Sequence, residues 1–502
     1  MKVLNRIFGW ATSSRMKRLE YMMSSPADIQ QEVFTYLIEK AVYTEWGKKY
    51  GYSSITSPEI FRERVPVSTY EDLFPFIDRI MKGEQNILWP EPINFFSKSS
   101  GTTNAKSKFI PVSEESLFDC HYQAGKDMLS LYSALYPETN LFKGKCLAIG
   151  GSYQKNFMNQ DLVCGDVSAI LMKNLPFWAQ YMRTPSIEVA LMEEWEAKIE
   201  KMAHSVIDEY VVSMAGVPTW TLVLLERILE ITGKSSIAEV WPDLELFAHG
   251  AVAFGPYRDT FKKLINNPRM NYLEVYNASE GYFGLQDRNV EDEMLLLLDH
   301  GIYYEFIPSS EWGKDHPKAV GVGEVELGKN YAMLITTNAG LWRYQIGDTV
   351  RFTSLAPHRI KISGRTKQFI NAFGEELIVE NAEDAITKAC KATEAQITNF
   401  TAGPIYLEQG KKGGHEWIIE FEKLPNDFDK FSKILDQRLQ EINSDYEAKR
   451  YKDIALIRPK IHCAEQGLFY KWMAGRGKLG GQHKVPRLAN SREYLDSILE
   501  MI

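Results

Sequence analysis

Short apolar runs alternate with helical stretches through the middle of this chain, and that alternation restricts the possible folds more than any other feature of the sequence. The apolar runs are Cys146–Ile149, Tyr210–Met214, Leu244–Ala248, Tyr272–Tyr276 and Met294–Leu298. Between two of them, the apolar residues of Thr219–Ile231 recur at the spacing of a helix. Strands that alternate with helices predict an α/β sheet whose ligand-binding loops lie at the strand ends.

Two helices are predicted before this region. Ser25 and Pro26 have the residue types of a helix cap and of a first helical position, and apolar residues then recur at helical spacing as far as Ala41. Glycines at positions 47 and 51 indicate the end of this stretch. Ser113 is expected to open a second helix that runs to about Tyr132.

The pattern changes in the last third of the chain, where a second domain is predicted. Three closely spaced strands are expected at Tyr331–Thr336, Thr349–Phe352 and Arg359–Ile362. After Gly364 the expected elements are helices near Glu380–Cys390 and Phe428–Ile442 and strands near Ile397–Thr401, Glu416–Phe421 and Pro459–Cys463. We place the boundary near Arg365–Lys367. The prediction is a large α/β domain over residues 1–366 and a small α+β domain over residues 367–502.

Composition limits the class of protein. Of the 502 residues, 44% are apolar and 25% are charged, as in globular proteins. The net charge of −8 argues against non-specific binding of nucleic acid, which needs a basic face. The longest uncharged stretch, Tyr210–Leu225, is too short and too polar to span a bilayer, so no membrane contact is expected. Five scattered cysteines without a CxxC pair indicate a reducing compartment, and we predict a cytoplasmic location.

The first eighteen residues contain five Lys or Arg and no Asp or Glu. This composition favours an amphipathic surface helix and leaves a transit peptide as the alternative. No apolar segment of a secretion signal follows it.

Ser99–Lys108 is the most informative segment for chemistry. Four hydroxyl side chains surround Gly101, namely Ser99, Ser100, Thr102 and Thr103. Hydroxyls, exposed amides and the lysine charge of Lys108 are suited to phosphate oxygens. The alternative is an ordinary Ser/Thr-rich surface turn. The segment is not a P-loop, because it does not match the GxxxxGK[ST] pattern.

Two further segments carry candidate nucleotide ligands. Tyr276–Gly281 follows a predicted strand and ends in Glu280 and Gly281; a tyrosine can stack on a base, and a carboxylate can hold Mg²⁺. The alternative is a simple strand-to-loop transition. Trp342–Asp348 ends in Gly-Asp, which we expect between two strands. An aspartate there can accept both hydroxyls of a ribose, although Gly-Asp is also common in hairpin turns.

A glycine-rich segment lies close to the end of the chain, over Gly475–Arg487. It contains GxGxxG, but too few residues follow for the βαβ unit of a dinucleotide-binding fold. One interpretation is a mobile loop that delivers Lys484 to a phosphate. The other is a solvated basic tail.

The order of these four segments resembles the acyl-adenylate-forming superfamily of acyl-CoA synthetases, luciferases and peptide-synthetase adenylation domains. The closer resemblance is to the Gretchen-Hagen-three family of auxin-responsive acyl acid amido synthetases, particularly its bacterial members. The matching motifs are Ser99–Thr103 with Lys108 and Pro111, Tyr276–Glu280, Glu305–Pro308, Tyr344–Asp348, Gly364–Lys367 and Gln482–Arg487. The likeness runs from about Ser25 to Leu488. It departs at Asn104 and Ala105, where plant members usually carry small residues including glycine.

This resemblance implies a ligase with a large N-terminal adenylate-forming domain and a small mobile C-terminal domain. Such an enzyme uses ATP and Mg²⁺ to convert a carboxylic acid into an acyl-adenylate, and then transfers the acyl group to an amine such as an amino acid. Two alternatives stay open. One is an acyl-CoA ligase with the same adenylation step, and the other is a nucleotide-binding interaction protein without catalytic activity.

The resemblance also assigns roles to individual residues. The implied nucleotide-binding residues are Ser99, Ser100, Thr102, Thr103, Lys108, Tyr276, Ser279, Glu280, Asp348 and Arg365. Within this set, Glu280 would hold Mg²⁺, Tyr276 would contact adenine, and Asp348 would bind the ribose with help from Arg365. Lys484 would be the catalytic residue that bridges the carboxylate and the α-phosphate. The small domain would rotate about a hinge at Lys367.

Overall fold

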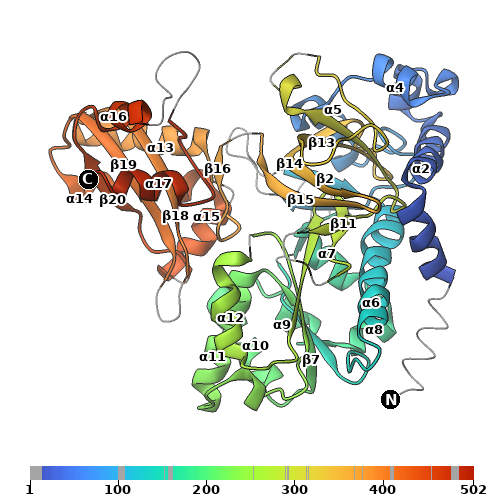
Figure 1. Cartoon of the computed structure of the whole chain (residues 1–502), viewed down its shortest axis with the longest axis horizontal. Coiled ribbons are helices and arrows are strands. Elements are labelled where there is room, and N and C mark those ends of the chain that lie inside the picture. The colour runs from blue at the N-terminus through green and yellow to red at the C-terminus, as the bar shows by residue number, and fades with distance from the viewer. Residues whose placement is uncertain are drawn as a thin grey trace.

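A mixed β-sheet forms the centre of the large unit of the molecule, and a smaller unit packs beside it (Figure 1). The computed structural model describes residues 14–99, 108–151, 153–155, 162–252, 254–288, 290, 293–312, 314, 316–366, 368–375, 377–407, 412–453, 455–475 and 485–502. Within these residues the sheet has eleven strands in the order β12-β13-β14-β15-β11-β10-β9-β8-β7-β3-β6.

One half of this sheet is parallel. It consists of β6 (Arg183–Thr184), β3 (Lys145–Ala148), β7 (Val211–Gly216), β8 (Leu246–His249) and β9 (Asn271–Ala278). The connecting helices include α10 (Trp195–Val206), α11 (Pro218–Thr232) and α12 (Arg258–Ile265). The α/β alternation predicted from the apolar runs is therefore confirmed. The carboxyl ends of these strands are where such sheets bind ligands.

The other half of the sheet is antiparallel. It continues through β10 (Gly281–Leu285), β11 (Met294–Leu296), β15 (His358–Arg365), β14 (Tyr344–Leu355), β13 (Asn330–Thr337) and β12 (Ile302–Pro308). The three strands expected between positions 331 and 362 are present, although each is longer than predicted.

A second, four-stranded sheet carries the start of the hydroxyl-rich segment. Its order is β2 (Lys108–Val112), β1 (Phe95–Ser99), β5 (Val163–Gly165) and β4 (Tyr153–Lys155). β1 and β2 are antiparallel, and Ser99 pairs with Lys108. The two strands thus hold both ends of the segment side by side, whereas residues 100–107 lie outside the described part of the chain.

Both predicted early helices are present. α2 (Pro26–Ala41) begins with Ser25 at the cap position, but the Ser25 side chain makes no capping hydrogen bond. The helix ends at Ala41, earlier than its glycines suggested, and α3 (Glu45–Lys49) begins behind a Thr44 cap. Ser113 does cap its helix, because its hydroxyl accepts from the Ser116 amide at 2.9 Å. A π-helical turn (Ser116–Tyr122) then leads into α6 (Gln123–Leu135).

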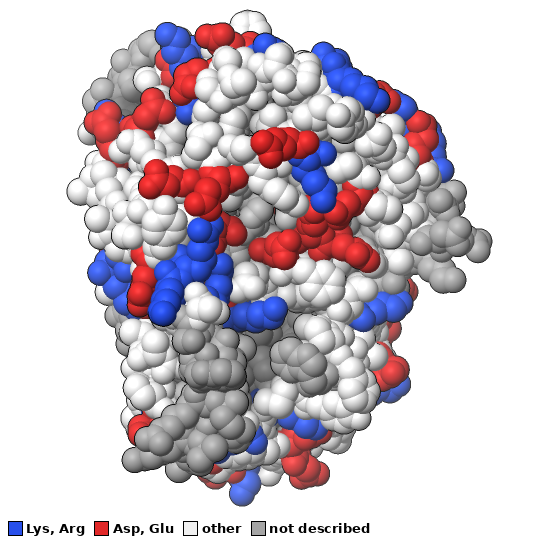
Figure 2. Space-filling view, turned by 90° about the vertical axis from the view of Figure 1, so that its right-hand side faces the viewer, with Lys and Arg blue, Asp and Glu red and all other residues white. Residues whose placement is uncertain are grey.

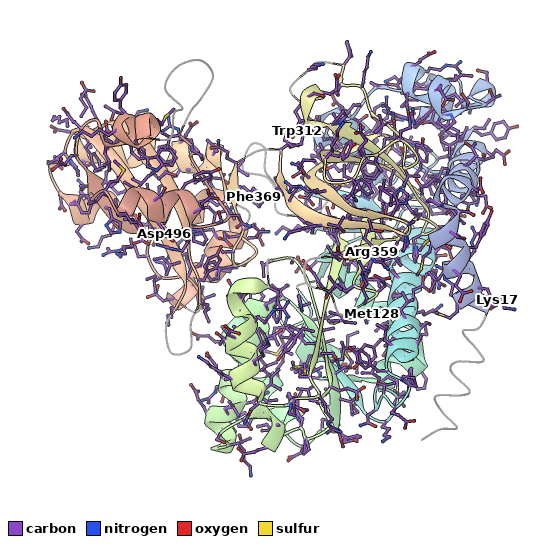
Figure 3. All side chains as sticks on the ribbon, in the orientation of Figure 1. Lys17, Met128, Trp312, Arg359, Phe369 and Asp496 are labelled. Carbon is purple, nitrogen blue, oxygen red and sulfur yellow. The ribbon has the colours of Figure 1, made fainter. Side chains whose placement is uncertain are left out.

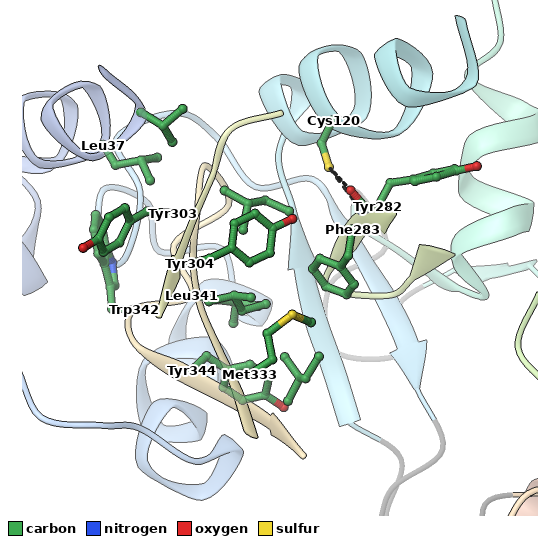
Figure 4. Close-up of a cluster of buried hydrophobic side chains, with 14 of the residues drawn as sticks. Leu37, Cys120, Tyr282, Phe283, Tyr303, Tyr304, Met333, Leu341, Trp342 and Tyr344 are labelled. Atoms are coloured by element: carbon green, nitrogen blue, oxygen red, sulfur yellow. Dashed lines mark hydrogen bonds between the residues drawn. The ribbon is translucent and has the colours of Figure 1, made fainter. Parts of the chain in front are cut away.

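The core of the large unit lies between α2, the π-helical turn before α6 and the antiparallel half of the sheet. The buried face of α2 packs there through its apolar residues, among them Val33, Phe34 and Leu37. Figure 4 shows Leu37, Cys120, Tyr304 and Trp342 gathered in this core. The helical spacing in the sequence therefore predicted the side of α2 that is buried.

The C-terminal unit is an α+β structure, as expected. The hairpin of β16 (Phe369–Ile370) and β17 (Leu377–Ile378) precedes a sheet of β18 (Gln396–Ile405), β19 (Gly414–Lys423) and β20 (Lys460–Ala464). Its helices are α13 (Val379–Thr393), α14 (Phe428–Ile442), α15 (Ser444–Arg450), α16 (Leu468–Gly475) and α17 (Glu493–Leu499). We call this unit, from β16 onward, the C-terminal unit. The exact division at residues 366 and 367 stays a prediction.

The outer surface of the large unit mixes charges of both signs. Figure 2 shows the face turned away from the C-terminal unit, where acidic and basic side chains lie next to one another. Ion pairs of α2 illustrate this mixing, since Glu32 pairs with Arg18 at 2.6 Å and Lys40 pairs with Glu91 at 2.9 Å. Among the described residues, no helix has both the length and the apolar content needed to cross a membrane.

Candidate active site

A cleft of about 1310 Å³ runs between the two units. The large unit lines it with the ends of β1 and β9, with β14 and β15, and with the loops that follow β3, β7 and β8. The C-terminal unit lines it with the turn after β16, with α15 and with the chain near residues 486–491. The cleft therefore includes the carboxyl ends of the parallel strands, the place expected for a ligand.

Asp348 lies inside β14 and faces this cleft, so its predicted position between two strands is wrong. The reason is a bulge. Ala332 pairs with Thr349 and Leu334 pairs with Gln345, which leaves residues 346–348 opposite a single residue of β13. Gly347 has a φ of +93°, a conformation that glycine adopts without strain, so the strand passes through the Gly-Asp pair without turning.

The Asp348 carboxylate is held from two sides. The Tyr276 hydroxyl donates to Oδ2 at 2.6 Å, and the Arg365 Nε donates to Oδ1 at 2.6 Å. The Asp348 side chain is only 16% exposed. A carboxylate offers about four lone-pair positions, so two remain for a ligand after these bonds are made. The structure thus brings together three residues that the sequence placed in three separate motifs.

Tyr276 is more deeply buried than a base-stacking residue needs to be. It lines the cleft with 6% of its surface exposed, and its ring packs edge-on against Phe283 at 4.9 Å. Burial and the neighbouring Asp348 raise the pKa of the Tyr276 hydroxyl well above its usual value. The hydroxyl therefore stays protonated and keeps donating to Asp348. Its contact with adenine stays a prediction.

Ser279 and Glu280 form the tight turn between β9 and β10, where Ala278 pairs with Gly281. Both residues line the cleft. The Ser97 hydroxyl of β1 donates to the Ser279 hydroxyl at 2.8 Å and joins this turn to the hydroxyl-rich segment. The sequence analysis did not identify Ser97 as a site residue. Its position could have indicated this, because Ser97 and Ser99 are two residues apart on one strand and their side chains therefore lie on the same face.

Of the hydroxyl-rich segment, the structure describes only the two ends. Ser99 lines the cleft at the end of β1. Lys108 lies across from it, with its ammonium 5.6 Å from the centre of the Tyr70 ring, and is not among the described lining residues. Ser100, Thr102 and Thr103 lie outside the described residues, so their proposed contacts with phosphate stay predictions.

Arg365 links the nucleotide motifs to the C-terminal unit. Besides its bond to Asp348, its guanidinium lies 5.2 Å from the centre of the Phe369 ring. Figure 3 labels Phe369 at the edge of the C-terminal unit that faces the large unit. The proposed hinge residue Lys367, between Arg365 and Phe369, is outside the described residues.

The region around the proposed catalytic lysine is anchored on its C-terminal side. Lys484 itself lies outside the described residues. Val485 is buried, the Pro486 carbonyl accepts from the Thr401 hydroxyl at 2.6 Å, and the Arg487 amide donates to the Gln368 side chain at 2.5 Å. Gln368 and Pro486 both line the cleft, so the chain reaches the cleft wall two residues after Lys484.

A buried ion pair supports the strands that carry Asp348. Arg343 donates to both carboxylate oxygens of Glu305, at 2.9 and 3.0 Å, and to the Val65 carbonyl at 2.7 Å. Arg343 is 4% exposed and Glu305 is 1% exposed. Removal of one partner would weaken the compensation of a buried charge, so the pair helps to hold β12 and the start of β14 in place.

The part of the cleft wall at the parallel strands combines apolar side chains with the polar Asp166, Ser168 and Glu193. The apolar side chains include Ile149, Met192, Val217, Trp220, Val252 and Phe254. Lys198 of α10 also lines it, although only 2% of the residue is exposed, and its ammonium donates to the Gly150 carbonyl. Burial lowers the pKa of Lys198 to about 8. This region can hold an apolar group beside one buried cation.

The donor set fits a magnesium ion that arrives with a nucleotide better than a resident metal. Within the described part of the chain, no group of three His, Cys, Asp or Glu residues could hold a metal ion. Mg²⁺ commonly takes one or two protein carboxylates and completes its shell with phosphate oxygens and waters. Glu280, on the cleft wall beside Ser279, can supply such a carboxylate.

Comparison with known proteins gives matches along nearly the whole chain. The GH3 family N-terminal domain matches residues 15–270, the central domain residues 295–365 and the C-terminal domain residues 380–493. Indole-3-acetic acid-amido synthetase GH3.3 of Arabidopsis thaliana is 24% identical over 96% of this chain and 93% of its own. Jasmonoyl--L-amino acid synthetase JAR4 of Nicotiana attenuata is 25% identical over 94% of this chain and 92% of its own.

Solved structures share the fold. A GH3.15 acyl acid amido synthetase superposes with a TM-score of 0.61 at 17% identity and covers 97% of this chain and 95% of its own. A 2-hydroxyisobutyryl-CoA ligase in its thioesterification state reaches a TM-score of 0.56 at 13% identity over 94% of this chain and 90% of its own. The expected architecture, a large α/β unit followed by a small α+β unit, is therefore confirmed.

Proposed function

This chain belongs to the GH3 family, and we propose that it activates a carboxylic acid with ATP and joins the acyl group to the amine of an amino acid. One observation carries the proposal. Asp348, Tyr276 and Arg365 meet in a cleft that also exposes Ser99, Ser279 and Glu280 and that both units line. A site lined by two units is suited to a reaction in two steps, because a change in their relative position can admit ATP and the acid first and the amine afterwards.

In the first step, a carboxylate oxygen of the acid attacks the α-phosphorus of ATP. The new O–P bond forms as the bond to pyrophosphate breaks. Because two anions must meet, cations and fixed donors are the main source of catalysis. Lys484 would lie between the carboxylate and the α-phosphate, while Ser99, Ser100, Thr102 and Thr103 with Lys108 would bind the outer phosphates.

The nucleoside would bind along β9 and β14. Asp348 would accept the ribose hydroxyls through the lone pairs that Tyr276 and Arg365 leave open. Tyr276 would bound the adenine pocket with its ring. Glu280 and Ser279 would face the phosphates, with Glu280 as the protein ligand of Mg²⁺. The magnesium ion, when bound, neutralises phosphate charge.

In the second step, the amine nitrogen of the acceptor attacks the acyl carbonyl carbon. A C–N bond forms, the C–O bond to AMP breaks, and the nitrogen releases a proton. We propose that the C-terminal unit, residues 367–502, turns about Lys367 between the two steps, so that one cleft serves both partners.

Thioester formation with CoA is the second candidate for this step. The specific observation in its favour is the shared fold with a CoA ligase. Both candidate functions include the same adenylation step. They differ in the acceptor of the acyl group, which is an amino acid in the first and CoA in the second.

The test is a panel of carboxylic acids in ATP–pyrophosphate exchange, followed by incubation of each accepted acid with the twenty amino acids or with CoA. We expect exchange with at least one apolar acid, amide formation with an amino acid and no thioester. Lys484→Ala, with an unchanged melting temperature, serves as the control and should lose most of the exchange. Exchange with no acid would reject the proposal. Equal exchange in the Lys484→Ala variant would reject the role of Lys484, and a thioester in place of an amide would select the second candidate.

A further inference from the structure

Lys449 is a cation of the C-terminal unit that lies against the large unit. It belongs to α15, its side chain is 7% exposed, and it lines the cleft. Its ammonium lies 5.7 Å from the centre of the ring of Trp220, which is part of α11 in the large unit. Among the described lining residues, it is the one lysine or arginine that comes from the C-terminal unit.

The partners of this ammonium hold it in place and compensate its charge only in part. Nζ donates to the Gly374 carbonyl at 2.9 Å, and the nearest carboxylate oxygen, of Asp445, is 3.8 Å away. A carbonyl and an aromatic face stabilise a cation less than a hydrogen-bonded carboxylate does. An ammonium withdrawn from water therefore attracts an anion that reaches it through the cleft.

Buried hydrogen bonds hold the turn that positions this ammonium. Glu375, with no exposed surface, accepts from the Phe373 amide at 2.7 Å and from the His415 ring at 2.8 Å. Gly374 has a φ of +85°, and a Cβ at this position would lie 3.7 Å from the Lys449 Nζ. A side chain at Gly374 would therefore lie in van der Waals contact with the end of the Lys449 side chain.

The other cations of the described cleft wall all belong to the large unit: Lys98 of β1, Lys361 and Arg365 of β15, and Lys198 of α10. Arg365 is bound to Asp348 on the nucleotide side, and Lys198 lies in the part of the cleft wall at the parallel strands. In the second step the acid no longer carries a carboxylate, because that group has become the acyl carbonyl of the adenylate. The acceptor amino acid brings a new carboxylate into the cleft at that stage.

We propose that Lys449 binds the carboxylate of the acceptor amino acid. The inference rests on the proposed function. It adds a residue that determines specificity, because Lys449 would favour an amino acid over an amine that lacks a carboxylate. Because Lys449 belongs to the C-terminal unit while Trp220 belongs to the large unit, this acceptor site is complete only when the two units are packed as they are here.

The test compares an accepted amino acid with its own carboxamide, which keeps the amine and lacks the carboxylate. Amide formation from pre-formed acyl-adenylate is measured for the wild type, for Lys449→Gln and for Lys449→Arg. A charge-assisted contact corresponds to roughly a 10- to 100-fold preference. We expect the wild type to prefer the amino acid by that factor in kcat/KM, Lys449→Gln to lose the preference, and Lys449→Arg to keep most of it.

The matched control is Lys388→Gln, which removes a lysine of α13 that pairs with Glu441 at 2.7 Å outside the cleft. It should behave like the wild type. Two results would overturn the inference. In one, Lys449→Gln keeps the preference for the carboxylate; in the other, it slows both acceptors equally, which would mean that Lys449 only joins the two units.

Pyrophosphate exchange separates this inference from the proposed function. Lys449→Gln should exchange pyrophosphate as fast as the wild type, because the acceptor takes no part in adenylation. Loss of exchange in this variant would assign Lys449 to ATP or to the acid and overturn the inference, while the proposed function would stand. Absence of exchange in the wild type would remove the proposed function itself.

Discussion

At the scale of single residues, the candidate site depends on one carboxylate with two fixed partners. Asp348 accepts from Tyr276 and from Arg365, and these bonds orient the carboxylate toward the cleft before a ligand arrives. A group that is already oriented loses less entropy when it binds. The effect of each partner can therefore be measured separately.

We predict that Asp348→Ala weakens ATP binding by about 2 kcal/mol, because hydrogen bonds to a charged acceptor contribute in that range. Tyr276→Phe should cost about 1 kcal/mol, since the carboxylate remains but loses one fixed partner. Calorimetric titration with ATP measures both. Tyr331→Phe is the control, because the Tyr331 hydroxyl accepts from the Glu326 amide and is not part of the cleft wall described here. Wild-type affinity for ATP in a folded Asp348→Ala variant would contradict the ribose role.

We predict that Glu280→Gln shifts the Mg²⁺ dependence of pyrophosphate exchange to a concentration about tenfold higher or more, because a neutral amide is a poorer ligand for this cation than a carboxylate. The measurement is a magnesium titration of the exchange rate at saturating ATP. Glu193→Gln is the control, since Glu193 is another glutamate of the cleft wall. Identical titrations for both variants would show that Glu280 is not the metal ligand.

At the scale of elements, charged clusters hold strands and helices in register. In the C-terminal unit, Glu416 of β19 accepts from His462 of β20 at 2.7 Å, pairs with Lys460 at 2.7 Å, and accepts from Arg492, before α17, at 2.8 Å. Burial alone would raise the pKa of Glu416, but these hydrogen bonds outweigh it and lower the pKa to about 2.

This shift makes the stability of the C-terminal unit depend on pH. A carboxyl group whose pKa is lower in the folded state stabilises the fold above its unfolded pKa, and the contribution is lost as the pH falls toward 2. We predict that Glu416→Gln lowers the free energy of unfolding by about 2 kcal/mol at pH 7, and that the difference disappears near pH 2. Urea unfolding at several pH values measures it. Glu422→Gln, an exposed position of the same strand, should change little; a pH-independent loss in Glu416→Gln would show that charge is not the cause.

At the scale of the whole molecule, the described residues of the two units meet through polar contacts and through apolar packing, since one buried cluster includes both Tyr257 and Ala372. The Tyr257 hydroxyl of the large unit donates to the Ala372 carbonyl at 2.8 Å, and the Asn371 side chain donates to the Ala251 carbonyl at 3.3 Å. Bonds of this kind between domains must break when the domains move relative to one another. The balance between orientations should therefore respond to the loss of a single bond.

We predict that Tyr257→Phe shifts this balance by about 1 kcal/mol away from the packed arrangement. Amide formation should slow by roughly fivefold while pyrophosphate exchange stays the same or rises. The ratio of the two rates is the measurement, with small-angle X-ray scattering to follow the distance between the units. Tyr406→Phe is a matched control, because the Tyr406 hydroxyl donates to the Asn490 carbonyl at the same 2.8 Å but within one unit. Equal ratios in the two variants would contradict the prediction.

The sequence alone indicated several helices and strands of both units and the residue types of the candidate site. Periodicity identified the buried face of α2, the parallel strands and the span of α14, because burial against a core repeats at the period of the element itself. It did not determine where Asp348 lies, since a bulge at Gly347 depends on the register with β13. The sequence also did not indicate that Asp348 binds both Tyr276 and Arg365. Nor did it indicate the hydrogen bond between Ser97 and Ser279 or the contact of the Lys449 ammonium with the Trp220 ring. These contacts join residues far apart in the chain, and only the packing of strands and of the two units brings them together.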